Sequence, residues 1–374
     1  MSTDAPVPVT VITGFLGSGK TTLLNRLLAH PDLADTAVLV NEFGEIGLDH
    51  LLVREVDENV VLLNAGCLCC TVRGDLVDTL RDLFLKRVRG EVPAFNRVAV
   101  ETTGLADPAP IIHTLMSDPI LGARYRFDDI VTTVDAVNGA NQMDAQPEPV
   151  KQAAVADRIV LTKADIADAP ALDGMRARLA QLNPAAPVFV ANHGDVPPDA
   201  LLEAGLFNTR DKIPDVERWL AAEAYAPAEG GGHGDDHRHG HGHDHDHDHG
   251  RHHDTHRHDT HRHDTNRHDD RIGAFCLTVD EPIVWDAFVS WVEMLLATKG
   301  EDVLRVKGVL DIEGVDHPVV VHGVQHVFHP PAALPAWPEG KRGSRLVMIT
   351  RDLGQEAVEK TLHAFLDAAK AEGK

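Results

Sequence analysis

The chain has 374 residues, 43% of them hydrophobic, and a formal net charge of −23 with histidine neutral. That length allows two domains with cores of their own, whereas the negative charge and the lack of a basic stripe argue against nucleic acid or an anionic membrane surface as a partner. The sequence shows neither a run of roughly 18 apolar residues nor a signal-peptide pattern. Because three of the four cysteines are crowded into residues 67–70, we expect a cytoplasmic protein without a disulfide framework.

Strand-like and helix-like segments alternate through residues 1–220, which predicts an α/β domain with a mainly parallel sheet. Strands are expected at Val7–Ile12, Thr36–Val40, Val60–Leu63, Arg97–Val100, Asp129–Val134, Arg158–Leu161 and Val188–Ala191. Helices are expected at Thr22–Ala29, Arg73–Arg89, Pro108–Met116, Pro149–Ala154, Leu172–Leu182 and Pro198–Ala204. In such a sheet, nucleotide-binding loops follow the carboxyl ends of the strands.

The first strand leads into GFLGSGKTT at residues 14–22, which fits the phosphate-binding pattern G-x-x-x-x-G-K-[ST]. In this loop the glycines let backbone N–H groups turn onto phosphate oxygens, Lys20 reaches the β- and γ-phosphates, and the Thr21 hydroxyl ligates Mg²⁺. The following helix N-terminus also favours anions. The residues assigned to the nucleotide here are Gly14, Gly17, Ser18, Gly19, Lys20, Thr21 and Thr22.

Two loops follow the second and third predicted strands. In the first, residues 41–49, Glu42 and Asp49 either serve a metal- or γ-phosphate-sensing switch or are solvated loop acids. The second contains Cys67, Cys69 and Cys70, which as thiolates would bind Zn²⁺ or another soft metal; the alternative is that they are small buried hydrophobic residues. Three thiolates would leave a coordination position open, which suits metal transfer. We also expect Cys70 and Thr71 to contact the nucleotide.

Two further motifs complete the predicted nucleotide site. Glu101 ends an apolar strand where a carboxylate would hold Mg²⁺ or its waters, and Gly104 could direct a backbone N–H to the γ-phosphate; with Lys20 and Thr21 these residues are assigned to hydrolysis. The segment Thr162-Lys163-Ala164-Asp165 matches the guanine-reading pattern [NT]-K-x-D, in which Asp165 accepts from the base and Lys163 packs over it. Thr162 stands where Asn is more frequent, which we expect to loosen this loop.

Residues 221–271 contain most of the 24 histidines and, beyond position 230, no apolar side chain. This composition predicts a disordered linker whose imidazoles collect metal at many loosely defined sites, among them His241, His243, His245, His247 and His249. Residues 272–374 alternate again and predict a small α+β domain. Strands are expected there at Ile272–Val279, Val303–Ile312, Val319–Phe328 and Ser344–Thr350, and helices at Trp285–Ala297 and Gln355–Ala371.

Three histidines of this last region, His322, His326 and His329, invite a metal interpretation. In one continuous strand only His322 and His326 would share a face. Packing is therefore the favoured interpretation for these residues, and their role stays open.

Taken with GFLGSGKTT, the segments NEFGEIG (41–47), GCLCCT (66–71), ETTGLADP (101–108), TKAD (162–165) and RVKG (305–308) resemble the CobW-like family of P-loop metal-handling GTPases, in the class that includes UreG and HypB. The resemblance implies a P-loop GTPase domain over 1–220 that uses GTP, Mg²⁺ and Zn²⁺ or Co²⁺. It further implies that GTP assembles the cysteine site and that hydrolysis releases the metal to a client apo-metalloprotein.

Three functions remain open at this point. The first is a zinc metallochaperone, the second a cobalt-supplying GTPase of cobalamin biosynthesis that would use the same residues, and the third a zinc storage or sensing protein in which nucleotide only gates binding. Zinc stands above cobalt in the divalent affinity series, which favours the first weakly. The client and the oligomeric state, including a homodimer, are not set by the sequence.

Overall fold

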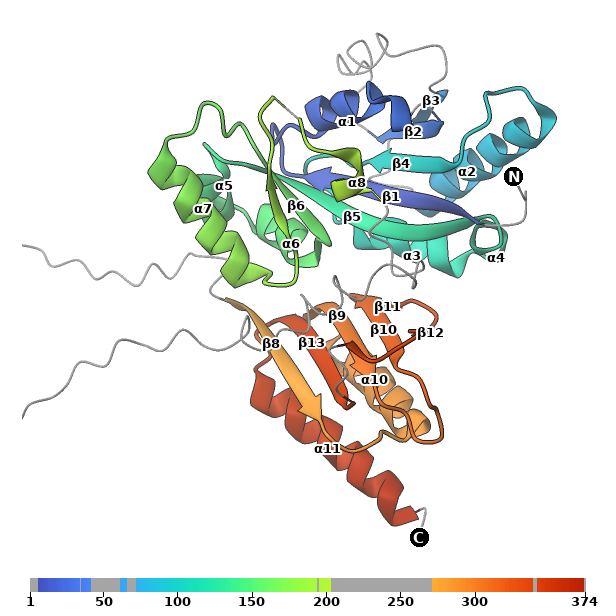
Figure 1. Ribbon diagram of the computed structural model, residues 1–374, viewed down its shortest axis with the longest axis vertical. Coiled ribbons are helices and arrows are strands. Elements are labelled where there is room, and N and C mark those ends of the chain that lie inside the picture. The colour runs from blue at the N-terminus through green and yellow to red at the C-terminus, as the bar shows by residue number, and fades with distance from the viewer. Residues whose placement is uncertain are drawn as a thin grey trace, which may run out of the picture.

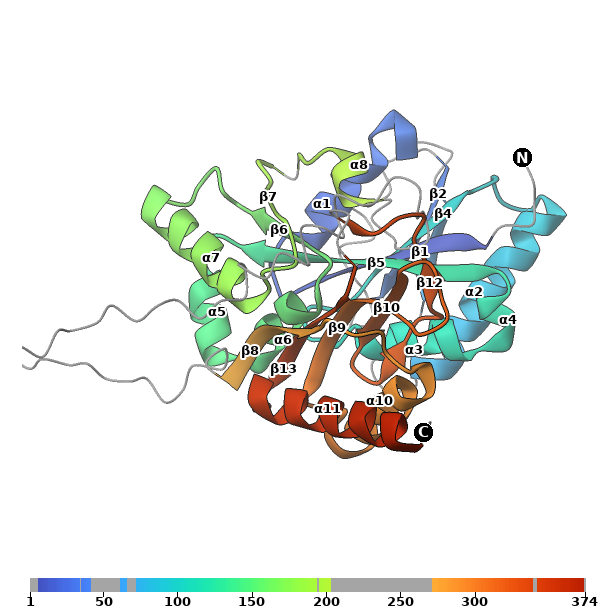
Figure 2. The ribbon, with the colours of Figure 1, turned by 60° about the horizontal axis from the view of Figure 1, so that its bottom comes forward.

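A computed structural model describes residues 6–33, 35–41, 61–65, 72–193, 195–202, 271–338 and 342–372. They form two sheets, each with its own helices, and Figures 1 and 2 show the second sheet lying against the helices of the first part of the chain. None of the described helices is long and apolar enough to cross a membrane.

The first sheet has seven strands in the order β3-β2-β4-β1-β5-β6-β7, and every pairing is parallel. Its strands are β1 (Val7–Gly14), β2 (Thr36–Asn41), β3 (Val61–Ala65), β4 (Arg97–Glu101), β5 (Tyr125–Asp135), β6 (Arg158–Thr162) and β7 (Val188–Val190). All seven predicted strands are therefore present, and β5 begins four residues earlier than expected, at the buried Tyr125. The predicted P-loop GTPase-like α/β fold is confirmed.

Helices cover both faces of this sheet because alternate strand residues point to opposite sides. Ala37 and Leu39 pack in the core beneath α2, α3, α6 and α7, whereas Val38 and Val40 pack with α1 and α8. The helices are α1 (Lys20–Leu28), α2 (Val72–Arg89), α3 (Ala109–Ser117), α4 (Pro119–Gly122), α5 (Gly139–Ala145), α6 (Pro147–Val155), α7 (Ala169–Leu182) and α8 (Pro198–Leu201), with a 3₁₀ turn at Pro31–Leu33.

The second sheet is antiparallel, with the order β11-β10-β9-β13-β8 and β12 paired to β10. Its elements are β8 (Ile272–Val279), α10 (Trp285–Lys299), β9 (Val303–Leu310), β10 (Val319–Val324), β11 (Val327–Phe328), β12 (Ala332–Ala333), β13 (Ser344–Arg351) and α11 (Gln355–Glu372). One face packs on α10 and α11 through residues such as Val306 and Met348. The opposite face contributes Leu304, Val324 and Ile349 to the core of the first part of the chain.

The predicted strand Val319–Phe328 was wrong in one respect, because the chain reverses within it. β10 ends at Val324, Gln325 takes a left-handed backbone with φ of 51°, and β11 pairs back with Val324 opposite Val327. The apolar residues on both sides of the turn are typical of a strand, and the turn contains none of the glycines or asparagines that usually mark one. As a result His322 does not share a face with His326 but stacks on His329, with ring centroids 4.6 Å apart.

Candidate nucleotide and metal site

The strand register brings the predicted nucleotide motifs to one edge of the parallel sheet. Ile12 lies opposite Glu101, so the phosphate loop after β1 and the acidic end of β4 are neighbours. On the other side Gly14 lies opposite Thr133, and Asp135 at the end of β5 lies opposite Thr162 at the end of β6. The loops that we assign to phosphate, Mg²⁺ and guanine therefore begin side by side.

The phosphate loop is supported from beneath by β5. Gly14 has φ of 143°, and a Cβ there would lie 2.2 Å from Thr133 Oγ1, so the loop requires glycine at this position. The fully buried Ser18 hydroxyl lies 2.7 Å from the same Thr133 oxygen. The Lys20 ammonium donates to the carbonyl oxygens of Gly14 (2.9 Å) and Phe15 (3.1 Å), which keeps it over the loop where phosphate oxygens would meet it.

The two residues expected at Mg²⁺ face each other. The Thr21 hydroxyl donates to Glu101 Oε1 at 2.7 Å, and Glu101 is buried. A hydroxyl and a carboxylate at this separation are within reach of one small cation, and both are oxygen donors of the kind that Mg²⁺ prefers. The chemistry of this donor pair fits Mg²⁺, and the glutamate at position 101 reaches Thr21 without an intervening group.

The segment after Glu101 lies directly on the phosphate loop. A Cβ at Gly104 would lie 2.6 Å from the Leu16 backbone nitrogen, so only glycine permits this approach. The amide of Gln152, a residue of α6 that is 1% exposed, donates to the carbonyl oxygens of Gly104 (3.2 Å) and Ala106 (3.0 Å). Gln152 was not predicted as a site residue, because α6 also carries Glu148 and Lys151 and a single amide there gives no signal of its own.

The segment predicted to read guanine contacts neighbouring elements through two residues, Thr162 and Lys163. The Thr162 hydroxyl lies 2.6 Å from the carbonyl oxygen of Ser18 and 3.1 Å from that of Val134, so the expected loosening is not what the contacts indicate. Lys163 has φ of 57° and forms an ion pair with Asp135 at 2.7 Å. Burial alone would raise the pKa of Asp135, but hydrogen bonds from Lys163 and from the Asn138 side chain and backbone hold that pKa below its usual value.

Asp165, the residue expected to read the base, remains one-quarter exposed. Its Oδ2 lies 3.4 Å from His193 Nδ1. Asp135, which the sequence analysis did not assign, ends a strand outside any recognised motif, and its role appears only through the contact with Lys163.

Several predicted site residues lie outside the described residues: Glu42, Asp49, Cys67, Cys69, Cys70, Thr71, His241, His243, His245, His247 and His249. The points from which their loops depart are nevertheless described. Asn41 at the end of β2 pairs with Ala65 at the end of β3, and Val40 pairs with Glu101. Within the part of the chain that is described, no group of three or more His, Cys, Asp or Glu side chains is placed to hold a metal.

The C-terminal histidines lie in the contact between the two sheets. His322 and His329 are 5% and 7% exposed, and the ring of His329 also lies 5.2 Å from that of Phe127. Burial lowers the pKa of both imidazoles, that of His329 to about 4, with the nearby Arg305 adding to the shift. These histidines are therefore neutral packing groups at neutral pH.

Beside the histidines, Arg305 and Lys307 of the RVKG segment reach across to the first part of the chain. Both pair with Asp157, which is 9% exposed, Lys307 at 2.8 Å. Burial by itself would raise the pKa of Asp157, but these two cations hold it well below its usual value. The second Asp157 oxygen accepts from the Ile130 backbone N–H at 3.1 Å.

Comparison with known proteins gives two family matches that together span both sheets. Residues 8–190 match the CobW/HypB/UreG nucleotide-binding domain, and residues 272–366 match the cobalamin synthesis protein CobW C-terminal domain. The chain is 30% identical to the zinc chaperone YjiA of Escherichia coli over 353 residues, which cover 94% of this chain and 96% of that relative. It is 33% identical to the zinc chaperone CobW of Pseudomonas aeruginosa over 403 residues, covering 98% and 93%.

Solved structures of YjiA are also similar to this chain over nearly its full length. The zinc-bound YjiA GTPase from E. coli superposes with a TM-score of 0.66 at 27% identity, covering 96% of this chain and 99% of that one. A zinc-bound triple mutant of YjiA, in which one glutamate and two cysteines are replaced by alanine, gives a TM-score of 0.67.

Proposed function

Because the chain belongs to the CobW/HypB/UreG family of nucleotide-binding proteins, we propose that it is a GTP-hydrolysing zinc metallochaperone. In this proposal Cys67, Cys69 and Cys70 bind Zn²⁺, and a GTP-dependent cycle transfers the metal to client apo-metalloproteins. The relatives named zinc chaperones support zinc as the cargo.

The observation that carries the proposal is the register at the sheet edge. The cysteine loop departs from Ala65, whose strand neighbour Asn41 starts the predicted switch loop, and the next strand along ends at Glu101. Neighbouring strands are about 4.8 Å apart, so the start of the cysteine loop is roughly 10 Å from the proposed Mg²⁺ ligand. A change at the γ-phosphate could therefore act on the metal loop without crossing the molecule.

The proposed roles follow from the contacts. Thr21 and Glu101 would hold Mg²⁺, which when bound neutralises charge on the phosphates. Lys20 would place its ammonium on the β- and γ-phosphate oxygens, where charge develops during hydrolysis. Gly104 would offer its backbone N–H to the γ-phosphate, and the Thr162–Asp165 loop would select guanine.

Two alternatives use the same residues. Cobalt delivery for cobalamin synthesis is the second candidate, supported by the match to the cobalamin synthesis protein CobW C-terminal domain. Storage or sensing of zinc, with nucleotide only gating binding, is a third and differs by requiring no repeated turnover of GTP. The zinc-bound structure of a relative supports zinc delivery as our first candidate.

The proposal is tested by replacing Cys69 and Cys70 with alanine together and measuring zinc affinity with GDP and with a non-hydrolysable GTP analogue. We expect the double variant to lose the nucleotide-dependent difference in zinc affinity, because two of the three proposed ligands are gone, while GTP binds within about threefold of the unaltered protein. The difference must be measured, not the mere presence of zinc, since a relative lacking two cysteines still crystallised with zinc.

Two controls accompany this test. Cys276, a half-buried thiol in β8, is replaced by alanine to show that the effect belongs to the clustered cysteines. Deletion of residues 230–270 should lower the number of zinc ions bound but keep the tight site. Survival of nucleotide-dependent tight binding in the double-cysteine variant would contradict the proposed ligands.

A further inference from the structure

The turn between β10 and β11 places a side chain of the C-terminal sheet against the segment that follows Glu101. The Gln325 amide nitrogen lies 3.1 Å from Asp107 Oδ2 and 3.3 Å from Asp107 Oδ1. Beside it, the ring of His326 lies 5.3 Å from that of His113 in α3. Gln325 is 7% exposed and the Asp107 side chain 31% exposed, so this hydrogen bond is partly shielded from water.

The backbone at this turn is not one that glutamine commonly adopts. Gln325 has φ of 51°, in the left-handed region where Gly and Asn are the usual residues. Its backbone N–H is fixed to the Leu304 carbonyl oxygen at 3.1 Å, which anchors the turn to β9. A glutamine here meets no requirement of the turn itself, whereas its long amide side chain reaches Asp107.

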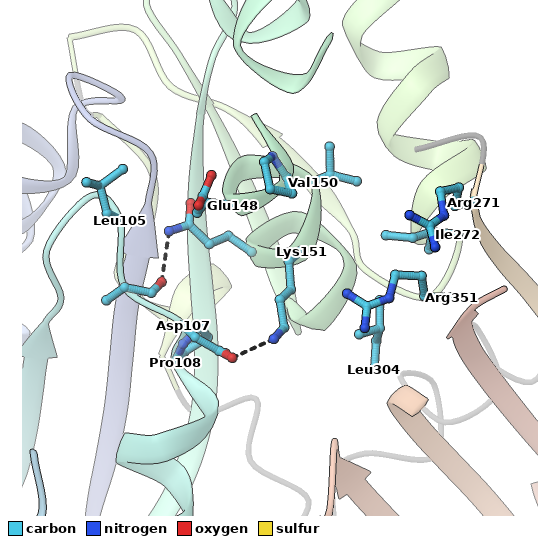
Figure 3. Close-up of a pocket in the computed structure, with 13 residues that line it drawn as sticks. Leu105, Asp107, Pro108, Glu148, Val150, Lys151, Arg271, Ile272, Leu304 and Arg351 are labelled. Atoms are coloured by element: carbon cyan, nitrogen blue, oxygen red, sulfur yellow. Dashed lines mark hydrogen bonds and ion pairs between the residues drawn. The ribbon is translucent and has the colours of Figure 1, made fainter. Parts of the chain in front are cut away.

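Asp107 in turn contacts two helices of the nucleotide domain. It pairs with Lys151 of α6 at 2.6 Å and accepts from the Ala109 backbone N–H, at the start of α3, at 3.1 Å. Three residues before it, Gly104 lies against the phosphate loop, and Gln152 donates to the carbonyl oxygens of Gly104 and Ala106. Figure 3 shows Asp107 and Lys151 directed toward each other at the edge of the cavity.

An interdomain cavity of about 340 Å³ flanks this segment. Leu105, Asp107 and Pro108 line one side, and Ile272 and Leu304 of the C-terminal sheet line another (Figure 3). Leu105 is 51% exposed, so apolar packing does not fix the segment on this side. Polar contacts therefore position it, and those of Gln152, Lys151 and Gln325 come from outside the segment.

We propose that Gln325 is a positioning residue for GTP hydrolysis. By holding Asp107, it keeps the Gly104–Asp107 segment against the phosphate loop, so that the C-terminal domain sets the rate at the nucleotide site. The inference rests on the proposed assignment of Gly104 and Glu101 to the γ-phosphate and Mg²⁺, and does not depend on which metal is carried.

The test replaces Gln325 with glycine and measures GTP hydrolysis by the full chain without zinc. Glycine accepts the left-handed backbone, so the variant should melt at the temperature of the unaltered protein or above it. We expect kcat to fall about fivefold to tenfold with KM within about twofold, because the segment is misplaced while the nucleotide contacts stay. Gln355→Ala is the matched control, since the hydrogen bond of that amide goes to the Cys276 carbonyl oxygen within the C-terminal domain.

A rescue experiment separates positioning from structural damage. Gln325→Glu sets a carboxylate against Asp107 and should lower kcat at least as much. Adding Asp107→Asn restores the hydrogen bond with the roles exchanged, so that the amide at position 107 donates to the carboxylate at position 325. In this double variant kcat should recover to within about twofold of the unaltered protein. An unchanged kcat in Gln325→Gly would overturn the inference. So would a double variant whose loss in kcat equals the product of the losses in the single variants Gln325→Glu and Asp107→Asn. Because zinc is left out, failure of the cysteine assignment would leave this result unaffected.

Discussion

Thr162 is the residue at which the loop that we propose to read guanine contacts the phosphate loop. Thr162 is 5% exposed, and its hydroxyl contacts the carbonyl oxygens of Ser18 and Val134. An asparagine would have a longer side chain at the same point. The contact implies that threonine supports this loop by joining it to the phosphate loop.

Removing that hydroxyl should weaken nucleotide binding. Thr162→Val keeps the shape but leaves two buried carbonyl groups without their donor, which costs about 1.4 kcal/mol, or about a tenfold rise in the Kd for GDP measured by calorimetry. Thr162→Ser is the matched control and should bind within about threefold. Equal affinities for the valine and serine variants would show that the hydroxyl contributes nothing to binding.

The sequence predicts the place of some residues in the site but not of others. Lys20, Thr21 and Glu101 belong to local patterns that carry their own chemistry, and the structure brings them together. Asp135 and Gln152 act through partners 28 and 48 residues away. No local pattern marks such contacts, because they exist only after the sheet and helices have packed.

At the scale of elements, hydrophobic periodicity located the strands well because a parallel sheet buried on both faces needs near-continuous apolar runs. It missed α4 and α5, which have four and seven residues and are too short to show a helical period. It also missed the reversal at Gln325, since the turn contains no residue typical of one. That turn is the one that contacts Asp107.

The contact between the two sheets buries charges and imidazoles together. Asp157 pairs with Arg305 and Lys307, and the stacked His322 and His329 lie on the same face of the second sheet. Neutral imidazoles fit beside these cations, whereas a protonated one would face Arg305. The packing of the two sheets should therefore be sensitive to acid.

The titration of His329 sets the direction and the magnitude of the expected change in folding stability with pH. An unfolded histidine titrates near pH 6.5, whereas burial lowers the pKa of His329 in the folded chain to about 4. The unfolded chain thus binds the extra proton in this window, and stability is lost as pH falls from 6.5 toward 4. Between pH 7.5 and 5.5 the loss from this one residue is about 1.4 kcal/mol.

The comparison uses His329→Phe, which keeps an aromatic ring but cannot titrate. Its unfolding free energy, measured by urea denaturation, should fall less than that of the unaltered protein between the two pH values, by about 1.4 kcal/mol. Asp129, whose pKa is raised by burial, has the opposite dependence but is present in both proteins. An identical fall in both would contradict a buried neutral His329.

At the scale of the whole molecule, one hydrophobic core contains residues of both sheets, and the loops that we assign to nucleotide and to metal leave the parallel sheet at the same edge. The motifs predicted the family correctly, and similarity to zinc chaperones over nearly the full length supports the same cargo. The sequence does not name the client, because client recognition depends on surface shape and not on a ligand pattern.

The central claim is that one nucleotide controls the affinity of one metal site. It is tested by measuring zinc affinity by competition with a chromophoric chelator, with Mg²⁺ and either GDP or a non-hydrolysable GTP analogue. We predict that the analogue tightens a single site by at least about 100-fold, since only a differential affinity can shift the metal between states. Equal affinities in the two nucleotide states would contradict the account, because hydrolysis could not then release the metal.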